Sequence, residues 1–390
     1  MIKPKLKPDN AHFSSGPCKK HSAWSVFSLS NAAVGRSHRS NYAHEKIKQA
    51  LALTRYILDV PTDYYIAIVP ASDTGAMEMA MWNLLGPKAL DILVYEHFAQ
   101  DWLYDITEEL KLKDVKCFKA AIGQMPDISN VNYNNDFLFV LNGTSLGMGL
   151  LNLDFIPKHR SGLTICDASA AAFSQKLDFS KLDVVTFSWQ KALGGEAAHG
   201  VIILSPKAIE RLETYSAPWA IPKILRLKNI DGSVNYELFS GKLLNTPSML
   251  CIEDYIISLL WVKSLGGVDQ LANRVAKNTK IIKNYVDKSD WLDFLIKDPD
   301  IRASTTQTLS IIDKDILMLN KSDQALFLHN VIAYLEEEQI AYDIAAYRKA
   351  PMGLRIWTGP TIEAEDLERL CSWLDYAFFT EKEKIIYKFL

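Results

Sequence analysis

Residues 184–205 read VVTFSWQKALGGEAAHGVIILS, in which two apolar runs flank one lysine and a pair of glycines. The runs at 184–187 and 201–204 are typical of short buried strands, and Lys191 lies in the connection between them. A buried ammonium group needs a carboxylate partner, a route to water or a lowered pKa. A desolvated lysine amine is also the group that forms imines with carbonyl compounds. Because most lysines lie on protein surfaces, Lys191 alone does not establish a catalytic site.

Strand-like and helix-like segments alternate on the amino-terminal side of this stretch. They are YYIAIVPAS (64–72), DTGAMEMAMWNLLG (73–86), LDILVYE (90–96), AQDWLYDITEELKL (99–112), VKCFKA (115–120), DFLFVLNG (136–143) and GLTICDAS (162–169). This alternation predicts an α/β fold with a mostly parallel sheet that helices cover on both faces.

The pattern changes after residue 250. Two long helical segments, 249–267 and 268–289, are followed by shorter strand-like and helical segments. We therefore expect a large domain over residues 1–260, which includes an N-terminal segment, and a small α+β C-terminal domain over residues 261–390.

The composition excludes several classes of protein. The chain has 390 residues, is 48% hydrophobic and 23% charged, and carries a formal net charge of −3, so no basic field for nucleic acid is expected. It contains no apolar run long enough for a membrane span and no secretory signal pattern. The five cysteines form no CxxC pair, and no HExxH motif is present. We expect a soluble cytoplasmic protein without metal or disulfides.

The segment Ser72-Asp73-Thr74-Gly75 closes one predicted strand and opens a helix. Free backbone N–H groups and the positive end of the helix dipole allow such a helix start to bind a phosphate group. By itself the pattern is weak evidence, because Asp or Thr at this position is more often a helix N-cap.

Three further residues lie where strands or helices meet the expected ligand edge of the sheet. Asp167 is suited to pair with a cationic ring nitrogen, Thr144 to bond a ring substituent, and Trp102 to stack on a flat cofactor; a turn aspartate, a turn threonine and a core tryptophan are the ordinary alternatives. Together with Lys191, which follows Asp167 by 24 residues, and the phosphate-binding helix start, the set describes a pyridoxal phosphate site.

Several stretches of the chain resemble the phosphoserine aminotransferases, which are class V, fold-type I pyridoxal-phosphate enzymes. They occur in family order and read FSSGPCKK (13–20), GRSHRS (35–40), VPASDTGAMEMAMWNLLG (69–86), NGTSLG (142–147), LTICDASAAAF (163–173), VVTFSWQKALGGEAAHGVIILS (184–205), NTPSMLCIEDY (245–255) and YRKAPMGLRIWTGPTIE (347–363).

The resemblance implies a role for each matching residue. Lys191 would be the Schiff-base lysine, with Gln190 beside it, and Asp167 would pair with the ring nitrogen. Trp102 would stack on the ring, Thr144 would bond the ring's 3-oxygen, and Thr74 and Gly75 would hold the phosphate. Asn245 and Thr246 would come from the neighbouring subunit, which implies a homodimer with a shared active site.

For the substrate, the resemblance assigns the α-carboxylate to Arg355 and the distal phosphate or carboxylate to His38 and Arg39, with Arg36 a weaker candidate. Many members of the family also carry a His-Arg pair before the carboxylate arginine. Here that segment contains Tyr347 and Arg348 and no histidine. Arg348 is the remaining candidate anion ligand there.

The implied reaction is a reversible transamination between glutamate and 3-phosphohydroxypyruvate that gives 2-oxoglutarate and O-phosphoserine, a step of serine biosynthesis. Use of 4-phosphohydroxythreonine in pyridoxine synthesis stays open. One alternative is another class V transaminase, such as an alanine- or serine-glyoxylate enzyme. A cysteine desulfurase is disfavoured because no cysteine precedes Arg355 in its loop, and a catalytically silent binding module is disfavoured because Lys191 and Asp167 are both present.

Overall fold

The computed structural model describes residues 1–386, and its larger part is built on a seven-stranded sheet. The strand order is β1-β7-β6-β5-β4-β2-β3. Strand β7 is antiparallel to both of its neighbours and the other neighbouring strands are parallel, which confirms the predicted mostly parallel sheet. The strands are β1 (Tyr65–Pro70), β2 (Leu90–Val94), β3 (Val115–Lys119), β4 (Asp136–Val140), β5 (Thr164–Asp167), β6 (Val184–Phe187) and β7 (His199–Leu204).

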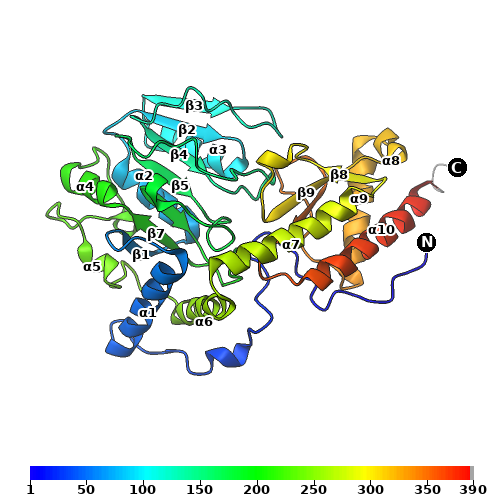
Figure 1. Ribbon diagram of the computed structural model, residues 1–390, viewed down its shortest axis with the longest axis horizontal. Helices are drawn as coiled ribbons and strands as arrows, with labels where there is room; N and C mark the ends of the chain where they lie inside the picture. The colour runs from blue at the N-terminus through cyan, green and yellow to red at the C-terminus, as the bar shows by residue number, and fades with distance from the viewer. Residues whose placement is uncertain (387–390) are drawn as a thin grey trace.

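Helices cover both faces of this sheet (Figure 1). On one face, α1 (Asn41–Leu58) and α6 (Met249–Leu265) pack against strand residues such as Phe139 and Val185. On the other face, α2 (Ser72–Leu84), α3 (His97–Tyr104) and α4 (Pro206–Thr214) pack against alternate residues such as Val140 and Val184. Successive strand side chains point to opposite faces, so the apolar runs supply both cores.

The smaller part is a three-stranded antiparallel sheet of order β10-β9-β8 with helices packed on it. Its strands are β8 (Leu292–Phe294), β9 (Thr306–Ile311) and β10 (Leu354–Trp357), and its helices are α8 (Lys314–Met318), α9 (Lys321–Glu337) and α10 (Ala364–Ile386). This arrangement confirms the expected smaller α+β part.

Helix α7 (Val268–Val286) connects the two parts, as Figure 1 shows. Its first residues, Val268 and Leu271, belong to the core under the large sheet, whereas Ile282 and Val286 belong to the core of the small sheet. The remaining short elements are α5 (Tyr236–Phe239), the 3₁₀ turns η1 (Val26–Leu29), η3 (Phe179–Lys181), η4 (Lys223–Leu225) and η5 (Pro299–Ile301), and the π-helical turn η2 (Asp105–Glu109).

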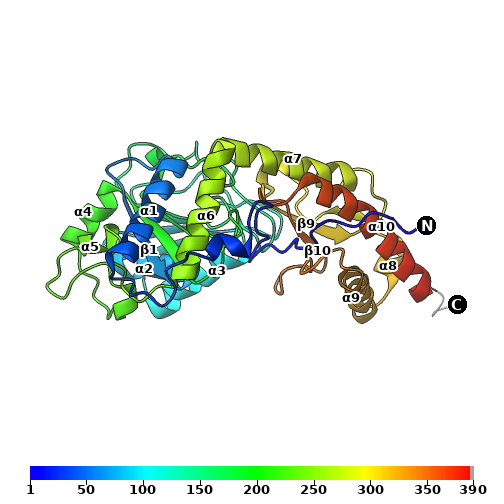
Figure 2. The same cartoon turned by 90° about the horizontal axis from the view of Figure 1, so that it is seen from below.

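The N-terminal segment lies along the small part, beside α10 in both views (Figures 1 and 2). The indole N–H of Trp373 donates to the carbonyl of Leu6 over 2.8 Å, and the backbone N–H of Trp357 donates to the carbonyl of Phe13 over 3.0 Å. The N–H of Cys18 then donates to the carbonyl of Gln190 over 2.8 Å. The segment therefore links the small part to the loop that carries Lys191. None of the helices described here is both long enough and apolar enough to cross a bilayer.

Candidate active site

A cavity of about 110 Å³ lies at the carboxyl ends of the central strands. Its walls come from the start of α2, from α3, from the segments that follow β4 and β5, and from the connection between β6 and β7. The lining residues are Ser72, Asp73, Thr74, Phe98, Trp102, Val140, Asn142, Thr144, Asp167, Ser169, Ala170, Gln190 and Lys191. The fold thus brings seven of the residues predicted from the sequence to one region. They are Thr74, Trp102, Thr144, Asp167, Gln190, Lys191 and the nearby Arg355.

Lys191 extends from the β6–β7 connection into this cavity. Its Nζ lies 2.6 Å from the carbonyl oxygen of Ser15 and 3.3 Å from Oγ1 of Thr144. A Cβ atom at Gly16, which has a φ of +150°, would lie 2.6 Å from the same Nζ, so only glycine leaves this space for the amine. Burial lowers the pKa of Lys191, and the charge of Arg355 lowers it further. A lowered pKa is one of the three alternatives that the sequence left open for a buried lysine at this position.

Asp167 ends β5 and is 4% exposed. Its Oδ1 accepts the backbone N–H of Ser169 over 3.0 Å, and its Oδ2 accepts the indole N–H of Trp102 over 3.3 Å. The carboxylate is therefore fixed in direction at the base of the cavity. The indole of Trp102, itself buried in α3, lies next to it.

Thr144 links the two cationic side chains of the site. Its Oγ1 is the hydroxyl near Lys191, and its backbone carbonyl accepts Nη1–H of Arg355 over 3.2 Å. The loop that carries Thr144 folds back on itself, because the N–H of Gly143 donates to the carbonyl of Met148 over 2.7 Å. A small displacement of this loop would move both contacts together.

Arg355 comes from β10 of the small part and reaches the large part through that bond to Thr144. Its guanidinium lies 5.7 Å from the centre of the Tyr347 ring, and its Nε is buried without a hydrogen-bond partner in the described chain. Burial lowers the pKa of Arg355, although an arginine remains charged near neutrality. An unpaired N–H of a fixed guanidinium is suited to donate a hydrogen bond to a carboxylate.

The start of α2 forms one wall of the cavity. The first N–H groups of a helix have no partner inside the helix, and Thr74 places this first turn against the cavity. Gly75 does not line the cavity; a Cβ there would lie 2.2 Å from the carbonyl oxygen of Pro70, so glycine allows the helix to start close to β1. Neither Asp73 nor Thr74 caps α2, because the N-cap residue is Ala71 and it makes no side-chain cap bond.

Besides Gly75 and Arg355, which lie next to the cavity without lining it, five other predicted residues lie outside the cavity of their own chain. Arg39 and Thr246 are exposed, and His38 and Asn245 are partly exposed, in the segments that precede α1 and α6. Arg348 is also exposed, and its guanidinium lies 5.9 Å from the ring centre of Tyr347. The structure does not bring these five side chains to Lys191 within one chain.

The structure also identifies residues that the sequence reasoning did not assign. Glu96 is fully buried; its Oε2 accepts the hydroxyl of Ser145 over 2.7 Å and its Oε1 accepts the N–H of Ala99 over 2.7 Å. Burial raises the pKa of Glu96 to about 7. The ring of Tyr347 lies near both the guanidinium of Arg355 and the ring of His97, whose centroid is 5.4 Å away. The only signal for Glu96 was its position before a helix, since its partner Ser145 is 49 residues away.

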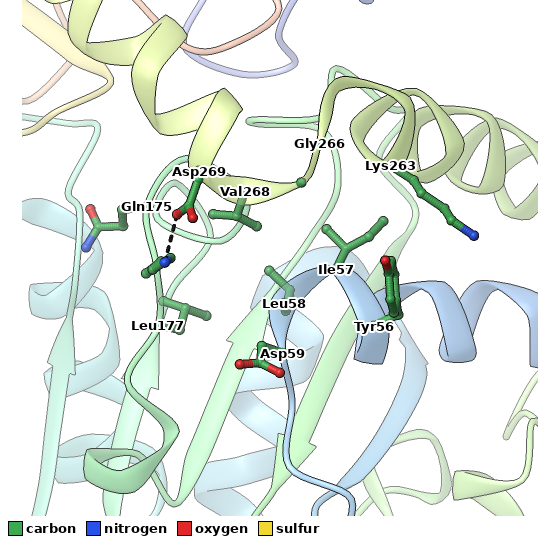
Figure 3. Close-up of a pocket in the computed structure, with 12 residues that line it drawn as sticks. Tyr56, Ile57, Leu58, Asp59, Gln175, Leu177, Lys263, Gly266, Val268 and Asp269 are labelled. Atoms are coloured by element: carbon green, nitrogen blue, oxygen red, sulfur yellow. Dashed lines mark ion pairs between the residues drawn. The ribbon is translucent and has the colours of Figure 1, made fainter.

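A second, larger cavity of about 450 Å³ lies where α1 and α6 end and α7 begins (Figure 3). Its lining includes Tyr56, Lys263 and the Lys176–Asp269 ion pair, in which the two charged atoms are 2.9 Å apart and both side chains are largely exposed. It contains none of the residues that the sequence singled out. The chemistry therefore belongs to the smaller cavity.

The chain is similar over almost its whole length to proteins of known name. No family model matches the chain. A phosphoserine aminotransferase from Methanosarcina mazei is 48% identical over 377 residues, which cover 97% of this chain and 99% of that protein. The chain belongs to the phosphoserine aminotransferase family.

Solved structures of the family share the fold. A phosphoserine aminotransferase from Cytophaga hutchinsonii superposes with a TM-score of 0.79 at 22% identity, covering 94% of this chain and 98% of the other. A pyridoxal-phosphate-bound phosphoserine aminotransferase from Trichomonas vaginalis gives a TM-score of 0.74 at 17% identity, covering 94% and 99%. At these identities the likeness concerns the fold alone, and it confirms the fold-type I architecture expected from the sequence.

Proposed function

We propose that this protein is a pyridoxal-phosphate-dependent phosphoserine aminotransferase that exchanges an amino group between glutamate and 3-phosphohydroxypyruvate. One observation carries the proposal beyond family membership. A lysine amine with a lowered pKa, a fixed carboxylate and a guanidinium with an unpaired N–H converge on one cavity, through Lys191, Asp167 and Arg355. Such a set suits a reaction at the α-carbon of an amino acid.

The residues of the cavity fit pyridoxal phosphate. Several buried polar atoms in or beside it have no partner in the described chain, among them Ser15 Oγ, Asp73 Oδ1, Asn142 Oδ1, Ser169 Oγ and Arg355 Nε. Because buried polar atoms are rarely left unpaired, these atoms mark surfaces that a ligand completes. The helix start at Thr74 and Gly75 would hold the phosphate, Asp167 the ring nitrogen, and Trp102, Thr144 and Gln190 the ring.

When bound, pyridoxal phosphate supplies a carbonyl that reacts with amines and a ring that takes up electrons. The protein supplies the positioning. Arg355 binds the α-carboxylate and orients the substrate against the Thr144 loop, to which it is hydrogen-bonded. Asp167 holds the proton of the ring nitrogen, and the buried indole of Trp102 excludes water from that side.

Lys191 moves the proton. Its neutral Nζ accepts the proton from the substrate α-carbon, and in the reverse half-reaction the same atom returns a proton there. The lowered pKa favours the neutral amine that this step requires. The carbonyl of Ser15 and the hydroxyl of Thr144 hold Nζ in place between transfers.

We further propose a homodimer in which the exposed anion-binding residues act on the partner's cavity. The segments that carry His38, Arg39, Asn245 and Thr246 lie close in sequence to exposed apolar side chains of η1, of α1, of the loop between them and of α6; these are Val26, Phe27, Val34, Tyr42 and Leu250. Exposed apolar side chains gathered in this way mark an association surface. Covering them with a second copy would bring further cationic side chains, such as Arg39, to the cavity that contains Lys191.

We also propose that the protein acts in the cytoplasm and that it serves serine biosynthesis. All five cysteines are free thiols, which supports the reducing cytoplasm. Serine biosynthesis is the process that the reaction serves, and 4-phosphohydroxythreonine, an intermediate expected in pyridoxine synthesis, carries the same distal phosphate and is a second substrate to test.

The proposal is tested by titrating the protein loaded with pyridoxal phosphate, and following its visible absorbance, with phosphoserine and separately with alanine. We expect the cofactor band to convert to the amine form with phosphoserine and not with alanine at equal concentration. Conversion with alanine alone would replace this assignment by another class V transaminase. A protein that binds no cofactor would overturn the proposal altogether.

A further inference from the structure

Asp73 is a second buried carboxyl beside Asp167. It lies in the first turn of α2, directly after Ala71 and Ser72, whose φ angles of +65° and +56° turn the chain sharply at the end of β1. Both carboxyls line the same cavity, and they are 7% and 4% exposed. Asp73 does not cap its helix, and its Oδ1 has no hydrogen-bond partner in the described chain.

The surroundings of this pair contain more acids than bases. Within the described residues neither Asp73 nor Asp167 forms an ion pair; both line one cavity of about 110 Å³ together with Ser169, and the groups that act on the Asp73 carboxyl are Asp167 and the hydroxyls of Thr186 and Ser169. Both of those hydroxyl oxygens are buried without a partner. The other titratable groups that act on the pair are three acidic groups and one base. The acidic groups are the carboxyl of Glu96, the phenol of Tyr95 and the thiol of Cys166, and the base is Lys191.

Two carboxylates in contact at a buried site cannot both stay ionised, because each destabilises the charge of the other. We propose that Asp73 and Asp167 share one proton, so that Asp73 is a neutral acid that donates a hydrogen bond to the Asp167 carboxylate. This inference rests on the proposed function only in the role given to Asp167. Asp73 is thus a positioning residue, and the pair presents a single negative charge to a cationic ring nitrogen.

Two further considerations support this arrangement. Burial, and next the negative charge of Asp167, raise the pKa of Asp73 well above its ordinary range. A phosphate bound at the start of α2 would add negative charge close to Asp73 and favour its neutral form still more.

The proton shared by Asp73 and Asp167 is detected by infrared difference spectroscopy on the ligand-free protein at neutral pH. We expect wild type minus Asp73→Asn to show the C=O stretch of a protonated carboxylic acid. The matched control is Asp127→Asn, because Asp127 is exposed and backbone and side-chain hydrogen bonds from Ser129 lower its pKa, so it contributes only carboxylate bands. A difference spectrum with carboxylate bands alone for Asp73→Asn would overturn the proposal.

Cofactor affinity then tests the donor role. Asparagine retains an N–H donor toward Asp167 and alanine does not, so Asp73→Asn should bind pyridoxal phosphate within about twofold of wild type and Asp73→Ala about tenfold more weakly. Equal losses in the two variants would contradict the donor role. If wild type binds no cofactor, the proposed function fails while the infrared result still decides whether the proton is present.

Discussion

At the scale of single residues, the reactivity of Lys191 follows from its surroundings. Burial is the first cause of its lowered pKa, and the positive charge of Arg355 acts in the same direction, whereas Cys18, Asp167 and Glu96 oppose it. The amine and the substrate-binding guanidinium are also linked through Thr144. The guanidinium to which we assign the substrate carboxylate therefore also favours the neutral form of Lys191.

This coupling predicts a shift in pH dependence for Arg355→Gln. Only the neutral amine attacks a carbonyl, so covalent capture of pyridoxal phosphate by the ligand-free protein should accelerate as the pH rises through the pKa of Lys191. Removing the guanidinium should raise that pKa and move the midpoint to higher pH. The control is Arg226→Gln, which alters an exposed arginine bonded to the carbonyl of Ile221. An unchanged midpoint in Arg355→Gln would contradict the coupling.

The residue scale also shows what the sequence could and could not predict. Asp167 is the last residue of a strand with a clear apolar pattern, and Lys191 lies four residues after the end of the next such strand. Because parallel strands end at one edge of a sheet, the sequence could predict that the two residues lie near each other. The contact between Asp73 and Asp167 was not predictable, because it depends on where the start of α2 packs across the strand order. Asp73 was considered as a helix cap, and that interpretation is wrong because Ala71 is the cap residue.

At the scale of elements, Glu96 holds α3 to the loop after β4. It caps α3 through Ala99 and accepts the hydroxyl of Ser145, the neighbour of Thr144. Ser145 Oγ also accepts the backbone N–H of His97 over 3.0 Å. The position of Thr144 between Lys191 and Arg355 thus depends on a carboxyl that contacts neither of them.

The raised pKa of Glu96 predicts a pH-dependent stability. Its folded-state pKa of about 7 lies above the ordinary value of 4.5, so its contribution to stability is complete below about pH 4.5 and is lost as the pH rises through 7. Glu96→Gln should therefore gain a few degrees in melting temperature relative to wild type between pH 5 and pH 8. Glu96→Ala should lose stability at both values because it removes the cap and leaves Ser145 unpaired. If the difference in melting temperature between Glu96→Gln and wild type were the same at pH 5 and at pH 8, Glu96 would not titrate in this range.

At the scale of the whole molecule, the site is assembled from distant segments. The N-terminal segment provides the carbonyl of Ser15, the small part provides Arg355 and Tyr347, and the large part provides the rest. An ion pair of 3.1 Å between Lys349 and Asp101 also joins the loop before β10 to α3, although both side chains are about half exposed and the pair contributes little. Sequence patterns are local, so the two domains were predictable while their meeting at Thr144 was not.

The proposed homodimer predicts complementation between two defective variants. A Lys191→Ala subunit lacks the amine but retains Arg39, and an Arg39→Ala subunit retains the amine of Lys191 but lacks the guanidinium. If Arg39 acts on the partner's cavity, each mixed dimer contains one intact site, and an equal mixture that exchanges subunits should recover about a quarter of wild-type phosphoserine turnover. Activity no higher than the mean of the two separate variants would show that Arg39 does not act across subunits.

The most direct test of the central claim is to identify the residue that binds the cofactor. The protein is incubated with pyridoxal phosphate, reduced with borohydride, digested and mapped by mass spectrometry. The structure predicts a single modified residue, Lys191, and loss of the modification when phosphoserine converts the cofactor before reduction. Modification of another lysine, or of Lys191 with no effect of phosphoserine, would contradict the account.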